Sequence, residues 1–157
     1  MAWNAAADRV FGFSSFPVER RNLLWLLFTA PSIRSLFDPW CDQALQILSS
    51  FRRDFVRAPL DPDIGVLVKD LEKVDPDFRS WWRQQDIHGP CQGIRYLQVP
   101  EVGAVVFDHT SLTIDVDRDL RLVYYAAREG QAQSRRFERW LIDEVQSAGS
   151  ASSALSQ

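Results

Sequence analysis

The 157-residue chain has the length of one domain, and its 46% hydrophobic and 25% charged residues are typical of globular rather than disordered proteins. Its longest uninterrupted apolar run, residues 23–28, is too short to span a bilayer, and no secretory signal is expected at its start. A net charge of −3 argues against nucleic-acid binding by this chain alone, and two cysteines cannot form a disulfide framework. We therefore expect a small domain in the reducing cytoplasm.

Three Asp-Pro pairs in the first half of the chain predict helix starts: Asp38-Pro39, Asp61-Pro62 and Asp75-Pro76. In each pair the carboxylate can accept a hydrogen bond from an amide of the first turn, and proline lacks the donor that would stay unsatisfied there. The helices that follow carry apolar residues at helical spacing, the second of them over residues 62–74. An earlier helix is predicted over residues 19–28, with later turns that are apolar all round.

The pattern changes after residue 88, where the apolar period falls from 3.6 toward 2 and indicates strands. A last helix is predicted after Gly130, and the Ser/Ala-rich residues 147–157 are predicted to form a disordered tail. Residues 1–146 then form one α+β domain, with helices packed on a small antiparallel sheet. The predicted strands are residues 94–99, residues 102–108 continuing irregularly through 116, and residues 120–127.

Four short segments, in this order along the chain, carry a resemblance to a known family. They are Ala2-Trp3-Asn4-Ala5, residues 19–28 (ERRNLLWLLF), Pro100-Glu101-Val102-Gly103 and residues 120–125 (LRLVYY). Together they resemble the MmyB-like ligand-binding domain, which in that family is the C-terminal half of bacterial helix-turn-helix transcription regulators of the XRE type. The resemblance covers roughly residues 3–141.

The resemblance implies a PAS-like fold whose pocket senses a small lipophilic molecule of fatty-acid type. It also implies a non-catalytic domain that is coupled to promoter binding by the other half of the regulator. The family carries a DNA-binding domain before the Trp-Asn motif, whereas this chain begins two residues ahead of it. DNA contact is therefore expected only through a helix-turn-helix domain that this chain lacks. The family often has His where this chain has Gln85 and Val99, so polar pocket chemistry at these two positions is not carried over.

Residues 23–28 have no polar face when placed on a helix, so this run must be covered on every side. The sheet, other helices and a bound apolar ligand can cover the run together. Alternatively, the run is a central packing helix, or it is buried in a dimer interface. Arg21 and Asn22 stand at the start of the run. The planar Arg fork suits the carboxylate of a lipophilic acid, and the first helical amides add favourable partial charge. A solvated or carboxylate-paired Arg is the alternative.

Aromatic residues supply most of the other candidates. Trp3-Asn4 is expected to end a strand and start a turn, with the indole either in the core or in a pocket wall. Trp81 and Trp82 are adjacent on one predicted helix, so one of them is expected at an interface or as a lid. The predicted ligand-binding residues are Trp3, Asn4, Arg21, Asn22, Trp25, Leu26, Phe28, Trp40, Phe107 and Tyr124.

Metal binding and catalysis find little support in the sequence. His88 and Cys91 have a ligand-like gap, but His109 and Cys41 are scattered and no second pair repeats the spacing, so no metal site is expected. Neither cysteine lies in a catalytic signature, and no nucleophile elbow or phosphate-binding glycine-rich loop is recognisable. We expect neither enzyme activity nor a cofactor. The expected partner is a small lipophilic ligand, and the alternative is a homodimerisation or interaction module without a ligand.

Overall fold

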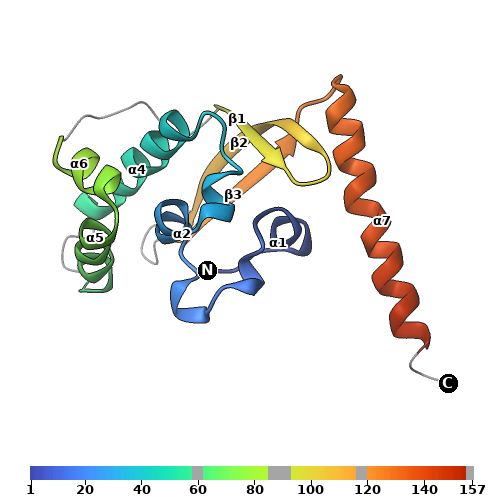
Figure 1. The fold of residues 1–157 in the computed structure, drawn as a ribbon, viewed down its shortest axis with the longest axis horizontal. Helices are drawn as coiled ribbons and strands as arrows, with labels where there is room; N and C mark the ends of the chain where they lie inside the picture. The colour runs from blue at the N-terminus through green and yellow to red at the C-terminus, as the bar shows by residue number, and fades with distance from the viewer. Residues whose placement is uncertain (58–61, 85–92, 116–119, 155–157) are drawn as a thin grey trace.

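The structure, a computed structural model, describes residues 1–57, 62–84, 93–115 and 120–154. Helices pack on a small antiparallel sheet with the strand order β1-β2-β3 (Figure 1), which confirms the predicted α+β class. The strands are β1 (Gly93–Val99), β2 (Gly103–Asp115) and β3 (Leu120–Ala127), and all three agree closely with the predicted ranges.

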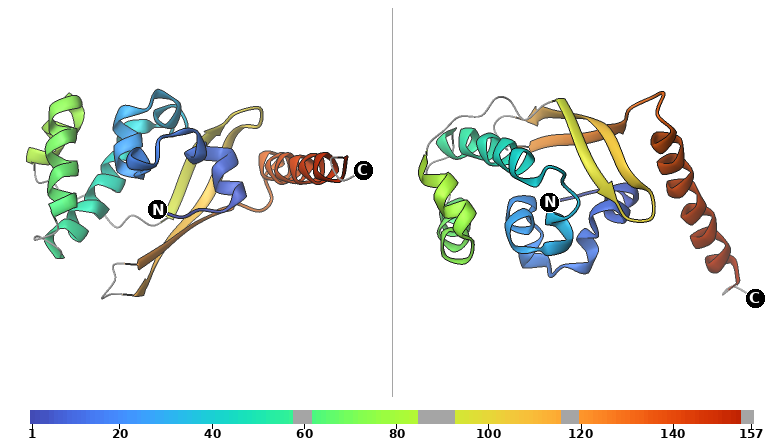
Figure 2. Two further views of the ribbon diagram at one scale, coloured as in Figure 1. Left: turned by 90° about the horizontal axis from the view of Figure 1, so that it is seen from below. Right: turned by 45° about the horizontal axis from the view of Figure 1, so that its top comes forward.

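The sheet has a buried inner face and an exposed outer face, because side chains alternate along each strand. β1 pairs with β2 from Gly93↔His109 to Val99↔Gly103, and β2 pairs with β3 beginning at Phe107↔Ala127. Helices α1 and α2 lie on the inner-face side (Figure 2). The inner face carries the buried residues Arg95, Leu97, Val99, Val105, Phe107 and His109. The outer face carries the exposed residues Ile94, Tyr96, Leu112, Leu122 and Tyr124.

The N-terminal part of the chain is divided into short helices. These are α1 (Ala5–Phe11), α2 (Leu23–Thr29) and α3 (Pro31–Arg34), with 3-10 turns at Phe13–Ser15 and Val18–Arg20. The prediction of one helix over residues 19–28 is wrong in its first part, because the backbone at Asn22 is extended (φ −124°, ψ 125°) and α2 begins only after it. The expected strand end at Trp3 is also wrong. Residues 1–4 are neither helix nor strand, and Asn4 caps α1.

The longer helices are α4 (Trp40–Arg57), α5 (Pro62–Val74), α6 (Pro76–Gln84) and α7 (Ala132–Ala154). Asp75 caps α6 as predicted, because its carboxylate accepts a hydrogen bond from the Phe78 amide at 2.7 Å. The Asp38 carboxylate accepts a hydrogen bond from the Gln98 side chain at 3.0 Å and so ties the start of α4 to β1. Asp61, the third predicted cap, lies outside the described residues.

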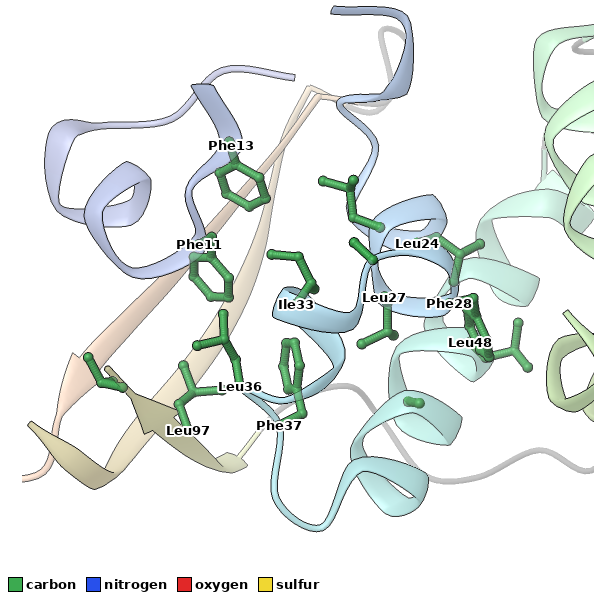
Figure 3. Packing of buried hydrophobic residues seen from close by; sticks show 14 of the residues in the cluster. Phe11, Phe13, Leu24, Leu27, Phe28, Ile33, Leu36, Phe37, Leu48 and Leu97 are labelled. Atoms are coloured by element: carbon green, nitrogen blue, oxygen red, sulfur yellow. The ribbon is translucent and has the colours of Figure 1, made fainter. Parts of the chain in front are cut away.

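The hydrophobic core lies between the inner face of the sheet and α2, and it continues beyond α2 toward α4 (Figure 3). Leu24, Leu26, Leu27 and Phe28 are buried, and Leu23 and Trp25 are partly buried, so the apolar run is covered on most but not all of its sides. Helices α5 and α6 lie at one end of the molecule and α7 at the other, with α2 between them (Figure 1). Helix α2 is therefore the central element of the fold.

Helix α7 packs on the core through its first turns, where Phe137 is buried and Trp140 and Leu141 are partly buried. The helix continues to Ala154 and so includes most of the segment that the sequence predicts as a disordered tail. The division into a domain of residues 1–146 and a tail of residues 147–157 stays a prediction.

Candidate functional site

Two of the predicted ligand-binding residues are helix caps. The Asn4 side chain accepts a hydrogen bond from the Ala7 amide at 2.8 Å, and the Asn22 side chain accepts one from the Trp25 amide at 3.1 Å. Each asparagine thereby satisfies a backbone donor that has no partner within its helix. Capping explains both asparagines without a ligand.

Arg21, the predicted carboxylate anchor, is engaged by backbone carbonyls nearby. Its Nε donates to the Phe16 carbonyl at 2.9 Å and its Nη2 donates to the Ser14 carbonyl at 3.1 Å. The guanidinium carbon lies 5.5 Å from the centroid of the Trp3 ring. Ser14 also donates two hydrogen bonds to the Asp8 carboxylate, which hold the pKa of Asp8 below its ordinary value. These contacts order the segment between α1 and α2, and the ligand-binding role of Arg21 stays a prediction.

Most of the predicted aromatic residues fall into two clusters on opposite sides of α2. The first, which we call the helical cluster, consists of Phe28, Trp40, Phe78, Trp81 and Trp82. Its ring centroids lie 5.1 Å apart for Phe28–Phe78 and 5.2 Å apart for Trp40–Trp81. Trp81 and Trp82 are both partly buried against the core, so the premise that only one of them can face inward is wrong, and an interface or lid role for either stays a prediction. Helix α6 lies between aromatic rings of α2 and α4: Trp81 contacts Phe28 of α2 and Trp40 of α4, and Trp82 contacts rings of α4.

The second cluster, which we call the sheet cluster, joins α1 and α7 to the inner face of the sheet. Phe11 lies 5.7 Å from Tyr125, and Phe107 lies 5.0 Å from Phe137, both measured between ring centroids. Trp3 joins the cluster at its N-terminal end. The members are Trp3, Phe11, Phe13, Phe107, Tyr125 and Phe137.

The structure therefore does not bring all ten predicted residues together. Phe28 and Trp40 are on the helical side of α2, whereas Trp3 and Phe107 are on the sheet side. Tyr124 is 46% exposed on the outer face, and its neighbour Tyr125 takes the inward position opposite His109. Leu26 is buried in α2, and Trp25 is partly buried with the Arg20 guanidinium 4.3 Å from its ring centroid.

The interface between α4 and the sheet contains polar residues that the site prediction missed. Arg95 on β1 is only 1% exposed and His109 on β2 only 4% exposed, and both belong to the inner face. The Arg95 Nη1 donates to the Gln46 Oε1 of α4, and the His109 ring lies 4.8 Å from the Tyr125 ring. The apolar residues Leu97 and Val99 alternate with polar positions in the sequence. Because Arg95 stands two residues before Leu97, the same alternation predicts that Arg95 lies on the buried face.

Helix α4 presents a polar side to this interface. The buried Gln43 donates hydrogen bonds to the Tyr96 carbonyl at 2.9 Å and to the Asp38 carbonyl at 3.0 Å. One turn further on, the Gln46 side chain accepts the hydrogen bond from Arg95. After one more turn, the Ser50 hydroxyl oxygen accepts a hydrogen bond from Arg121 Nη1 at 3.3 Å. We call the set that meets across this interface the polar interface; it consists of Gln46, Ser50, Arg95 and Arg121.

Of the predicted metal candidates, His109 is buried on the inner face of the sheet and Cys41 is exposed at the start of α4, while His88 and Cys91 lie outside the described residues. Among the residues that the structure describes, no group of three His, Cys, Asp or Glu side chains is placed to hold a metal ion. No helix in the described part of the chain is long and apolar enough to cross a membrane.

Comparison with known proteins gives one match. A family model described as the MmyB-like transcription regulator ligand binding domain matches residues 1–141. Searches of curated proteins and of solved structures found no match. The matched range contains both aromatic clusters and the polar interface, and it ends within α7.

Proposed function

Since the chain belongs to the MmyB-like ligand binding domain family of transcription regulators, we propose that it senses a small, mostly apolar molecule of fatty-acid type in a PAS-like fold. A family of regulator ligand-binding domains supports a sensing rather than an enzymatic role. In this proposal the domain acts in the cytoplasm, and it affects promoter DNA through a helix-turn-helix domain of the regulator.

The position of α2 carries the proposal of a lipophilic ligand. Four of the seven residues of this helix are buried, and it lies between the helical cluster and the sheet cluster. An apolar molecule placed against α2 would contact leucine side chains and aromatic rings, which are the usual lining of small-molecule sites. Each buried methylene of the ligand would contribute about 0.8 kcal/mol to binding. Affinity should therefore rise with the length of an alkyl chain.

The exposed outer face of the sheet supports an alternative function as a dimerisation module. Tyr96, Leu112, Leu122 and Tyr124 are between 46% and 49% exposed on this face. Exposed apolar patches are typical of surfaces that bind another protein. In this alternative the residues around α2 are a packed core and no ligand enters.

Thermal unfolding in the presence of saturated acids of increasing length separates the two functions. A ligand that binds only the folded state stabilises it in proportion to the logarithm of its concentration over its Kd. We expect the melting temperature to rise with chain length at equal free concentration. No shift with any acid, alcohol or ester, together with a concentration-dependent dimer in sedimentation experiments, would favour the dimerisation module.

A further inference from the structure

We infer that the first turn of α4 binds a neutral hydroxyl group of the ligand, with the Trp40 indole as donor and the Gln43 side chain as acceptor. The inference rests on the proposed function and names the polar group that the apolar molecule carries. Two buried polar atoms in this turn, Trp40 Nε1 and Gln43 Oε1, have no hydrogen-bond partner among the residues that the structure describes. Such atoms are rare in folded proteins, because an unpaired buried group loses its bonds to water and gains none in return.

The orientation of the Gln43 side chain is fixed by its amide nitrogen. Gln43 is only 3% exposed, and its Nε2 donates to the Tyr96 carbonyl at 2.9 Å and to the Asp38 carbonyl at 3.0 Å. Exchanging the amide oxygen and nitrogen would set Oε1 against two carbonyl oxygens, which excludes the flipped amide. Gln43 Oε1 is therefore a buried acceptor that needs an O–H or N–H donor from outside the described part of the chain.

Three side chains pack against the Trp40 indole. Between ring centroids it lies 5.7 Å from Phe28 and 5.2 Å from Trp81, and the guanidinium carbon of Arg34 lies 3.4 Å from its ring centroid. These contacts hold the indole in place, yet none of the described residues offers an acceptor to its Nε1. An indole N–H only donates, so its partner must be an atom with a free lone pair, such as an oxygen.

The donor and the acceptor belong to one turn of one helix that borders α2. The backbone amide of Gln43 donates to the Pro39 carbonyl at 3.4 Å, and residues three positions apart on a helix are neighbours on its surface. Trp40 contacts α2 through Phe28. A ligand whose apolar part packs on α2 can therefore present its polar end to this turn of α4.

The combination of a donor and an acceptor selects the chemistry of the polar group. A hydroxyl oxygen accepts from Trp40, and the hydroxyl proton is donated to Gln43. An ether oxygen would satisfy Trp40 alone. An ionised carboxylate has no proton for Gln43 and loses its hydration on burial, and the cation nearest to Trp40, Arg34, already pairs with Asp77 at 3.2 Å. We therefore expect a long-chain alcohol, or another lipid with a hydroxyl at this position.

The test measures the affinities of 1-decanol, its methyl ether and ionised decanoic acid for the whole 157-residue chain by titration calorimetry. Two variants accompany the wild type. Trp40→Phe keeps an aromatic ring and removes the donor. Trp82→Phe is the matched control, because it makes the same change in the helical cluster at a ring that contacts Phe51, Phe55 and Phe78. Circular dichroism establishes that each variant is folded, and the order of the three ligands in the wild type depends on no variant.

We expect the wild type to bind the alcohol about tenfold more tightly than the ether or the ionised acid, as for one buried hydrogen bond left unmade. Trp40→Phe should weaken binding of the alcohol and of the ether by about tenfold, whereas Trp82→Phe should leave both affinities within about twofold of the wild type.

Three results would overturn the inference and leave the lipophilic ligand standing. They are equal affinities of the wild type for alcohol and ether, tightest binding of the ionised acid, and equal effects of Trp40→Phe and Trp82→Phe on alcohol binding. If none of the three compounds binds to the folded wild type, the proposed function fails together with this inference.

Discussion

At the scale of single residues, Glu101 has a backbone conformation that an L-amino acid rarely adopts. Its φ is +66°, in a turn closed by a hydrogen bond from the Val102 amide to the Val99 carbonyl at 3.2 Å. Glycine or asparagine usually occupies such a position. The Glu101 carboxylate accepts a hydrogen bond from the Trp140 indole at 2.9 Å, and its carbonyl accepts one from Arg136 at 2.6 Å. The unfavourable turn residue thus connects the β1–β2 hairpin to α7.

Two substitutions at Glu101 separate backbone strain from the contact with α7. Glu101→Ala removes the bond to Trp140 and keeps the positive φ, so it should lower the free energy of unfolding by about 1 kcal/mol. Glu101→Gly loses the same bond but relieves about 1 kcal/mol of strain, so it should be close to the wild type. Urea denaturation of both variants measures the difference. Equal stability of the alanine and glycine variants would show that the backbone is not strained there.

At the scale of elements, the strands and the later helices could be predicted from the sequence because their signals are local. Alternation along residues 94–99 and the Asp75-Pro76 pair led to the observed β1 and α6. The N-terminal elements could not be predicted, because asparagine favours turns and helix caps alike, and Asn4 and Asn22 turned out to be caps. The apolar run was correctly expected to be buried. Which residues contact this run, and how far Tyr124 lies from it, depend on tertiary packing, and no local sequence pattern predicts that.

Substitution of Asn22 distinguishes a cap of α2 from a ligand-binding side chain. Asn22→Ala removes the acceptor for the Trp25 amide and should lower the free energy of unfolding by about 1 kcal/mol. Asn22→Asp keeps the acceptor and adds a negative charge at the helix N-terminus, so it should retain wild-type stability. Chemical denaturation without added ligand checks both values. A stable Asn22→Ala variant would contradict the capping role.

At the scale of the whole molecule, α2 separates two differently built regions. On one side, α4, α5 and α6 surround the helical cluster, and on the other the sheet carries the sheet cluster (Figure 2). The polar interface lies where α4 meets the sheet, so one helix contacts both regions.

Of the candidate site, the apolar part could be predicted from residues 23–28. The buried Arg95 was missed, because charged residues within strands are ordinarily expected to be solvent-exposed.

Native mass spectrometry of the purified chain tests the central claim, that this domain holds a small lipophilic molecule, most directly. The spectrum should show the 18.1 kDa chain together with a second species heavier by the mass of one amphiphile. Denaturation and solvent extraction should release that molecule, and adding a long-chain acid to the emptied protein should restore the heavier species. A protein that is purified without bound lipid, and that gains no mass with any acid, alcohol or ester while remaining folded, would contradict the account.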